Sequence, residues 1–267
     1  MPDVVVVGAG GSGLRAALGA AQQGLKVACV EMRATLGGTC LNVGCMPSKA
    51  LLHASEMFDA ANSEFAKIGI EVQPKLNLGQ MHKSKDDSVT ALTKGIEFLF
   101  KKNKADWIKG KGKIVGKGQV EVTAADGSVQ TLEAKNIVIA TGSRPYRPAD
   151  INFRHPRIYC SDTILSLSHT PRTLVIFGAG VIGCEYASIF SGLGVKVDLI
   201  NNRDSLLSFL DDEISDALSY HLRKHGVLIR HNEEYESVEG DEAGVVVRLK
   251  SGKKIRADAF LWANGRT

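Results

Sequence analysis

The sequence predicts an α/β protein built from two Rossmann-like domains, each with an antiparallel β-meander. Two observations predict this fold. A strand, a glycine turn, a helix and a second strand occur in that order twice, and the strands are continuously apolar, as in parallel sheets buried on both faces. The 267 residues suffice for two domains, which we place at 1–145 and 146–267.

The first repeat occupies the amino-terminal residues. Strand Val4–Val7 leads into the turn Gly8–Gly13, and an alanine-rich helix then extends to about Gln23. A second strand, Val27–Val30, ends on Glu31. This order is that of a βαβ unit, in which the two strands lie parallel.

Two helices, a meander and a further strand follow before the domain boundary. Pro47 starts a helix, because proline is favoured in a first helical turn and apolar residues then recur at helical spacing. A second helix is predicted over about 78–102. Short alternating strands with glycine turns predict a meander over 107–132, and the apolar run 137–140 predicts a buried strand. The boundary falls in Ser143–Pro148, because its two prolines block both helix and sheet.

The second repeat has the same order of elements but a different end residue. Strand Thr173–Phe177 leads into the turn Gly178–Gly183 and a helix. The next strand, Lys196–Ile200, ends on Asn201 rather than on an acid. A second meander is predicted over 227–262.

Composition and charge exclude several functions. There are 33 Lys and Arg against 29 Asp and Glu, a net charge of +4, and 6% of residues are aromatic, so a nucleic-acid-binding surface is not indicated. No apolar run reaches the roughly 18 residues of a membrane span and no signal peptide is evident, so we expect a cytoplasmic protein. The five cysteines and seven histidines lack metal-ligand spacing, so no metal site is predicted. Each histidine, His231 included, is interpreted as an ordinary surface or helix residue.

Gly8, Gly10 and Gly13 form a GxGxxG turn between a strand and a helix. Such a turn can serve packing alone, but here Glu31 ends the next strand 18 positions after Gly13, where a carboxylate accepts hydrogen bonds from a ribose. The first glycine permits the turn, the second admits a pyrophosphate to the backbone, and the third lets the helix approach the strand. This context predicts a dinucleotide-binding domain.

Gly178, Gly180 and Gly183 predict a second dinucleotide site, in which Asn201 replaces the acid. A carboxylate there would bind the ribose hydroxyls of NAD and repel a 2′-phosphate. An amide removes that repulsion, and the nearby Arg203 supplies a cation. We therefore expect NADP(H), alone or together with NAD(H). The alternative is that Arg203 is an exposed side chain without a ligand.

Cys40 and Cys45 are separated by four residues, which is close enough for a small disulfide loop. At the start of a helix the thiolate of Cys45 would be favoured, and the thiolate is the form that attacks disulfides. The spacing indicates a redox-active pair, and the alternative is two small buried side chains.

Four motifs together resemble the pyridine nucleotide-disulfide oxidoreductases, the flavoprotein family of lipoamide dehydrogenase, glutathione reductase and soluble transhydrogenase. They are Gly37–Lys49, Ala140–Ser143, Gly178–Glu185 and Ala263–Thr267. The resemblance covers the whole chain. Up to about residue 143 the chain is most similar to lipoamide dehydrogenase and beyond it to soluble transhydrogenase, so it is an unusual family member or was assembled from two relatives.

The resemblance implies FAD in the first domain and NAD(P)H in the second. Cys40 would meet a disulfide substrate and Cys45 would face the flavin, while Lys49 and Glu185 would form an ion pair beside the ring. The predicted cofactor contacts are Gly8, Gly10, Gly13, Glu31, Thr39, Lys49, Gly112, Thr141 and Gly142 for FAD, and Gly178, Gly180, Gly183, Asn201, Arg203 and Gly265 for the nicotinamide nucleotide.

The implied activity is FAD-dependent oxidation of NAD(P)H of the lipoamide dehydrogenase type, with electrons passing to the Cys40–Cys45 disulfide or to an added quinone or dye. Soluble transhydrogenation between NAD(H) and NADP(H) is an alternative. A third is a truncated or chimeric binding module with little turnover, because the family's acidic FAD motif and C-terminal dimerisation domain lie outside the sequence. For the same reason we expect a monomer whose partners are small molecules.

Overall fold

The computed structural model describes residues 1–267, and its contacts divide them into two units. The first unit comprises 1–47 and 86–143, and the second comprises 48–85 and 144–267. The sequence gives no indication that residues 48–85 group with the second unit. The functional division of the chain at 145/146 remains a prediction.

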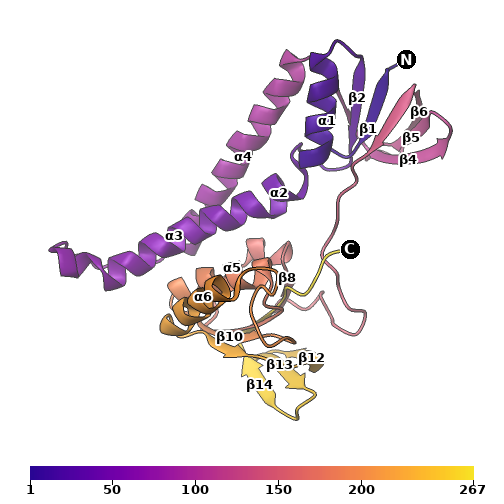
Figure 1. Cartoon of the computed structure of the whole chain (residues 1–267). Coiled ribbons are helices and arrows are strands. Elements are labelled where there is room, and N and C mark those ends of the chain that lie inside the picture. The colour runs from indigo at the N-terminus through magenta and orange to yellow at the C-terminus, as the bar shows by residue number, and fades with distance from the viewer. The chain divides into compact units, whose positions relative to one another are not determined.

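A parallel four-stranded sheet forms the centre of the first unit (Figure 1), in the order β3-β2-β1-β7. Its strands are β1 Val4–Val7, β2 Val27–Glu31, β3 Asp106–Lys109 and β7 Asn136–Ile139. The prediction that residue 107 belongs to the meander is wrong, because β3 pairs in parallel with β2. A strand of four residues has too few positions for its periodicity to separate a parallel edge strand from a hairpin strand.

Alternate residues of β1 face two different layers. Val4 and Val6 pack with α1 and the end of α4, whereas Val5 and Val7 pack with the meander. The elements of these layers are α1 Gly11–Gln22, α4 Leu78–Lys102, β4 Lys111–Gly116, β5 Gln119–Thr123 and β6 Val129–Glu133, with the short α2 Gly38–Val43 following β2. Both faces of β1 are therefore covered, which explains its uninterrupted valines.

The second unit contains a five-stranded parallel sheet in the order β11-β10-β9-β15-β8 and a separate meander. The parallel strands are β8 Ile158–Cys160, β9 Thr173–Phe177, β10 Lys196–Ile200, β11 Leu228–Arg230 and β15 Ala259–Trp262. The antiparallel strands are β12 Tyr235–Asp241, β13 Gly244–Leu249 and β14 Lys254–Ala257. The predicted second meander is thus too long, because its first and last strands join the parallel sheet.

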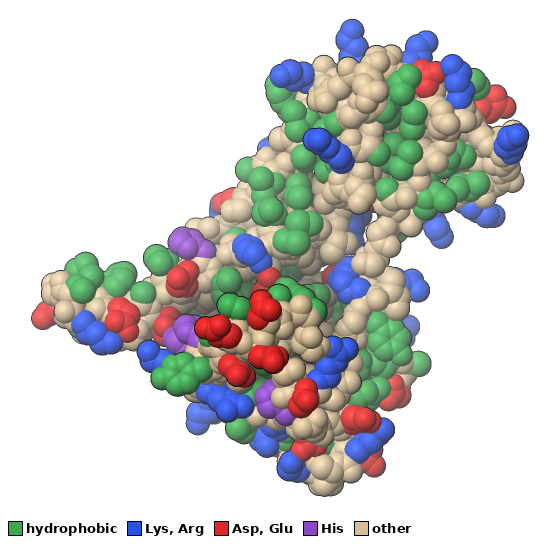
Figure 2. Space-filling view, viewed as in Figure 1, with side chains coloured by type: hydrophobic (Ala, Val, Ile, Leu, Met, Phe, Trp, Pro, Cys, Tyr) green, Lys and Arg blue, Asp and Glu red, His purple; other side chains and the backbone are tan.

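Helices α5 and α6 pack on the second parallel sheet. Helix α3 begins earlier than expected. The helical elements are α3 Cys45–Ser63, η1 Phe65–Ile68, η2 Thr163–Ser166, α5 Val181–Gly192 and α6 Asp212–Lys224. Helix α3 starts at Cys45 rather than at Pro47, because proline is tolerated throughout a first turn. Acidic side chains gather over α6 (Figure 2), and two of them lie in its first turn, where they complement the helix dipole. No helix has the length and apolar character needed to cross a membrane.

The first and third glycines of both turns are required by the fold itself. Gly8 and Gly178 have φ values of 102° and 108°, which side-chain-bearing residues rarely adopt. A Cβ on Gly13 would lie 1.8 Å from the carbonyl oxygen of Gly8, and a Cβ on Gly183 would lie 1.8 Å from that of Gly178. Each helix therefore packs against its strand only because these positions lack a side chain.

Replacing Gly183 by alanine is expected to lower the free energy of unfolding by about 1–3 kcal/mol, because the new methyl group overlaps a backbone oxygen. Gly180→Ala is the matched control, since a Cβ there meets no atom within 4 Å. Urea unfolding of both variants measures the difference. An equal loss of stability in the two variants would contradict this explanation of Gly183.

Candidate functional site

Glu31 lies buried at the end of β2, beside the first glycine turn. Its Oε2 accepts the N–H of Ala9 at 2.8 Å, and its Oε1 accepts the N–H of Arg33 at 2.8 Å. Two backbone donors therefore hold the carboxylate at the carboxyl end of the parallel strands, which is where sheets of this kind bind ligands. Each oxygen keeps a second lone pair that can accept a ribose hydroxyl.

The middle glycine of each turn is the one that the fold does not require. Gly10 and Gly180 have φ values of −73° and −80°, which any residue adopts. A Cβ on Gly180 would meet no atom within 4 Å, and one on Gly10 would meet only the Cα of Gly38, at 3.9 Å. Open space beside the unpaired N–H groups of a helix start fits the pyrophosphate of a dinucleotide. Both turns therefore fit the cofactors that the sequence predicts.

The turn before α2 is fixed by Asn42, a residue that sequence reasoning missed. Its Nδ2 donates to the carbonyl oxygens of Leu36 and Gly38, at 3.1 and 2.9 Å, and its Oδ1 accepts the hydroxyl of Thr35 at 2.6 Å. A Cβ on Gly38 would lie 2.4 Å from the Cα of Gly10. Asn42 thus holds the segment before the cysteine pair directly against the glycine turn.

The other residues predicted for FAD lie in the same unit, but the structure assigns one of them a packing role. Thr39 is half-buried in α2, and Thr141 and Gly142 are exposed after β7. A Cβ on Gly112 would lie 2.9 Å from Cγ1 of Val7, so the absence of a side chain there lets β4 pack on the parallel sheet. A contact between Gly112 and the adenosine remains a prediction.

The five thiols differ in exposure and in pKa. Cys40 is half-buried in α2, and Cys45 is exposed as the first residue of α3. Burial raises the pKa of Cys29 and of Cys184 to about 12, with a smaller contribution from a neighbouring carboxylate in each case. Burial also raises the pKa of Cys160, but hydrogen bonds to its sulfur outweigh that effect and the pKa falls below its ordinary value. Cys40 and Cys45 are thus the only cysteines outside the buried class, and their redox role remains a prediction.

Lys49 and Glu185 form an ion pair within the second unit, with 2.6 Å between Nζ and Oε1. The hydroxyl of Ser48 donates to the other oxygen of Glu185 at 2.9 Å, so α3 supplies a partner to each carboxylate oxygen. The Lys49 side chain is 58% exposed and that of Glu185 is 23% exposed. The structure therefore contains the pair that the family resemblance implies, while its position beside a flavin remains a prediction.

Asn201 lies buried directly after β10, and its position is equivalent to that of Glu31, the last residue of β2. Its Oδ1 accepts the N–H of Arg203 at 3.2 Å, just as Oε1 of Glu31 accepts the N–H of Arg33. Nδ2 of Asn201 donates to the carbonyl oxygen of Ser205 at 2.8 Å. The second site therefore repeats the backbone geometry of the first with a neutral side chain in place of the acid.

Two features beside Asn201 bear on the ligand that it can accept. The exposed Arg203 donates from Nη1 to the hydroxyl of Ser208 and forms no ion pair, so its charge is available to an anion. Sequence reasoning treated His231 as an ordinary residue, whereas its Nδ1 lies 3.3 Å from Nδ2 of Asn201. No signal in the sequence links the two, because they are brought together by neighbouring strands 30 residues apart.

A shallow cavity of about 510 Å³ opens at the carboxyl ends of β9 and β15. Gly265, with a φ of 99°, follows directly after one of its lining residues. The lining residues are Asp150, Phe177, Asn202, Glu234, Tyr235, Glu236, Lys250 and Asn264. The cavity therefore lies at the end of the sheet that holds the second glycine turn and Asn201.

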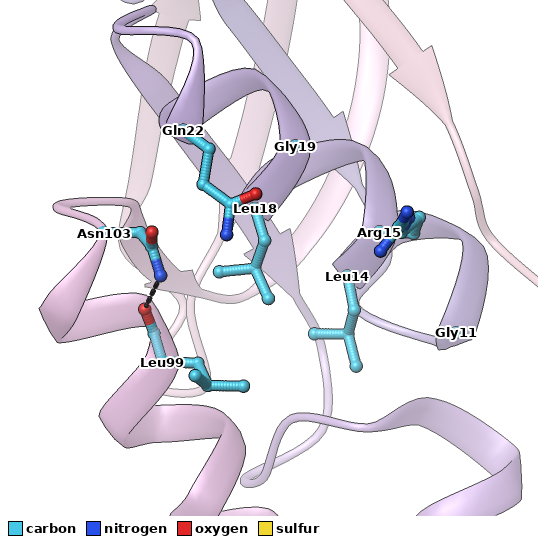
Figure 3. A pocket seen from close by; sticks show the side chains of 8 residues that line it. All are labelled: Gly11, Leu14, Arg15, Leu18, Gly19, Gln22, Leu99 and Asn103. Carbon is cyan, nitrogen blue, oxygen red and sulfur yellow. Dashed lines mark hydrogen bonds between the residues drawn. The ribbon is translucent and has the colours of Figure 1, made fainter.

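A different cleft, of about 350 Å³, runs between α1 and α4 in the first unit (Figure 3). Leu14 and Leu18 of α1 point into it and Leu99 of α4 points back toward them. Nδ2 of Asn103 donates to the carbonyl oxygen of Leu99 at 2.8 Å. This cleft follows the side of α1 rather than the strand ends, and none of the residues predicted to contact FAD lines it.

The family of pyridine nucleotide-disulphide oxidoreductases matches residues 2–267 of the chain. The chain belongs to this family. Its members use FAD and NAD(P)H and act on nicotinamide nucleotides and disulfides. Soluble pyridine nucleotide transhydrogenases of Chromohalobacter salexigens and Ectopseudomonas mendocina are 56% and 57% identical to it over 270 and 268 residues. Each match covers 99% of this chain and 57% of the relative, so the chain spans just over half the length of these relatives.

Solved structures show the same fold. The Cu(II) complex of the HOCl-induced flavoprotein disulfide reductase RclA from Escherichia coli matches with a TM-score of 0.86 and 27% identity, over 100% of this chain and 57% of that one. LpdA from Mycobacterium tuberculosis matches with a TM-score of 0.93 over 100% of this chain and 59% of that one, at 24% identity. Each unit of this chain therefore has the fold seen in these structures.

In the native, reduced protein, Cys45 is expected to react first with Ellman's reagent, because its side chain is exposed at a helix start. Cys45→Ser should remove the fast phase and Cys40→Ser should retain it. Cys29 and Cys184 should react only after unfolding, because burial holds their pKa near 12. A fast phase that survives in Cys45→Ser would refute the assignment.

Proposed function

We propose that this chain binds FAD in its first unit and NAD(P)H in its second, and that it forms the nucleotide-binding part of a soluble pyridine nucleotide transhydrogenase. The observation that carries the proposal is Asn201, which stands in the geometry of Glu31 without its charge. The names of the relatives that match 99% of the chain support the same reaction.

A transhydrogenase must admit NAD(H) and NADP(H) to its nicotinamide nucleotide site in turn. A carboxylate at position 201 would repel the 2′-phosphate of NADP(H). An amide can donate to or accept from a ribose hydroxyl and does not repel a phosphate, and the unpaired charge of Arg203 lies close by. These features suit a site that accepts both nucleotides.

The residues of the first unit would hold FAD through the turn at Gly10 and through Glu31. When bound, FAD supplies a ring that takes a hydride from one nicotinamide and passes it to another. Lys49 would provide a fixed positive charge that stabilises negative charge arriving on the ring, with Glu185 and Ser48 setting its position. This transfer does not require a base from a partner subunit.

Reduction of a disulfide of the lipoamide type is the second candidate function. It is favoured by one observation, the exposure of Cys45 at the start of α3 close in sequence to the half-buried Cys40. The thiolate is the reactive species in thiol–disulfide exchange, and an exposed thiol is accessible to a disulfide substrate. The two candidates differ in whether this thiol is needed.

Cys45→Ser is expected to leave hydride transfer from NADPH to an NAD analogue within about twofold of the parent chain, because that transfer uses no thiol. The measurement is the absorbance of thio-NADH formed by the FAD-loaded chain, with reduction of lipoamide assayed in parallel. Loss of both reactions in Cys45→Ser would argue against transhydrogenation as the main activity. A chain that stays colourless after incubation with FAD would overturn the proposal and favour a binding module without turnover.

Lys49→Ala is expected to slow reduction of bound FAD by NADPH by about tenfold or more, because a fixed charge beside the ring is lost. Stopped-flow absorbance of the flavin bands measures this rate. Lys67→Ala is the matched control, because Lys67 also forms an exposed Lys–Glu pair, with Glu64 at 2.8 Å. Equal rates in the two variants would remove Lys49 from the site.

A further inference from the structure

Asn201 and His231 follow directly after two neighbouring strands of the sheet and lie side by side. Strands β10 and β11 are parallel neighbours, and Ile200 pairs with Arg230, so the next residue of each strand lies at the same carboxyl edge. Two main-chain hydrogen bonds extend this pairing: Glu233 donates to Asn201 and Asn232 donates to Arg203, both at 3.1 Å. The imidazole of His231 is therefore held next to the ribose-binding position by the backbone on both sides.

The orientation of the Asn201 amide determines which nitrogen of His231 carries a proton. Oδ1 of Asn201 accepts the N–H of Arg203, and Nδ2 donates to the carbonyl oxygen of Ser205. The amide nitrogen, with two hydrogens, thus faces Nδ1 of His231 at 3.3 Å. Nδ1 must accept, so the neutral ring carries its proton on Nε2. Asn201 thereby presents His231 as a donor through its far nitrogen.

Among the charged side chains near Asn201 and His231, one cation has no ion pair. Arg230 is paired with Asp198 at 2.7 Å, and Glu233 is paired with Lys253. Asp204 accepts the hydroxyl of Ser205 at 3.3 Å. Arg203 binds only the hydroxyl of Ser208 through its side chain. The guanidinium of Arg203 is therefore not neutralised by a carboxylate, and the ring of His231 has an N–H at Nε2. Each group can donate to an anion.

The backbone near Asn201 and His231 is strained. The chain has three residues other than glycine with positive φ, and two of them are Leu207, at 45°, and Asn232, at 57°. The N–H of Leu207 donates to the carbonyl oxygen of Ala179 in the second glycine turn at 3.4 Å. Strained residues persist where surrounding contacts hold them in place, which is common at ligand sites.

We propose that His231 recognises the 2′-phosphate of NADP(H), to which its Nε2–H donates a hydrogen bond alongside the guanidinium of Arg203. This inference rests on the proposed nicotinamide nucleotide site and adds a specificity-determining residue to it. Asn201 then has two functions: it accommodates the ribose and it fixes the tautomer of the neighbouring histidine. NAD has a hydroxyl at that position and therefore lacks the phosphate that accepts this hydrogen bond.

The test compares two fragments that differ only in the 2′-phosphate, adenosine 2′,5′-bisphosphate and 5′-AMP, by isothermal titration calorimetry on the whole chain. Neither fragment contains nicotinamide, and neither measurement requires flavin turnover. His231→Ala is expected to weaken binding of the bisphosphate roughly tenfold to hundredfold, the range for a hydrogen bond to a charged group. Binding of 5′-AMP should stay within about twofold. His169→Ala, at an exposed histidine in the same unit, is the control.

Two further variants separate direct contact from positioning of Asn201. Gln places its amide nitrogen near the position of the histidine Nε2, so His231→Gln should retain most of the preference for the bisphosphate. Asn reaches only the position of Nδ1, so His231→Asn should lose the preference although it can still accept from Asn201. Rescue by Asn and not by Gln would overturn the proposal of a direct contact.

The outcomes also separate this inference from the proposed function. Equal loss of affinity for both fragments, or no loss, overturns the role of His231 while the dinucleotide site stands. A parent chain that binds neither fragment overturns both. A selective loss in His231→Ala together with no transfer from NADPH to thio-NAD supports the inference and counts only against transhydrogenation.

Discussion

The contact between the third glycine of each turn and the carbonyl oxygen of the first is the constraint on which both sites depend. In each unit that contact allows a helix to start directly against the end of a buried strand, because a Cβ would lie 1.8 Å from the oxygen. The start of the helix, with its unpaired N–H groups, then faces the carboxyl edge of the sheet. The open space at the middle glycine and the side chain that ends the next strand are placed by the same geometry. A methyl group at Gly13 or Gly183 would displace all of them together.

The two strand–turn–helix–strand repeats differ in the side chain at the end of the second strand, which is Glu31 in the first repeat and Asn201 in the second. Glu31 and Asn201 each accept the N–H of the residue two positions later, so the backbone around them is equivalent. The carboxylate also binds the N–H of Ala9 in its own turn, whereas the amide turns its nitrogen toward Ser205 and His231. A change from an acceptor-only group to a group that also donates therefore links Asn201 to His231, which follows the neighbouring strand β11.

The glycine turns and the strands that precede them could be predicted from the sequence in both units, whereas the pairing of several other strands could not. Strands β1 and β9 are buried on both faces, so their apolar runs and the glycine turns after them identify both units. The pairing of strands β3, β11 and β15 depends on where the chain returns after a crossover, which no local pattern records. The contact between Asn201 and His231 was missed for the same reason, because it exists only once β10 and β11 are neighbours. Asn42 was missed because its hydrogen bonds depend on the conformation of the turn that it holds.

The environment of the Lys49–Glu185 ion pair indicates that this pair positions a charge rather than stabilises the fold. Exposed Lys–Glu pairs contribute about 0–1 kcal/mol, and the pair Lys67–Glu64 is of that kind, with side chains 66% and 61% exposed. Glu185 differs, because its side chain is 23% exposed and its second oxygen is held by Ser48. A carboxylate fixed at both oxygens restricts where the ammonium group can lie, although the lysine itself remains mostly in solvent. Such an arrangement adds little to folding and orders one cation four residues after Cys45, and a cation held in this way would suit the role proposed for Lys49.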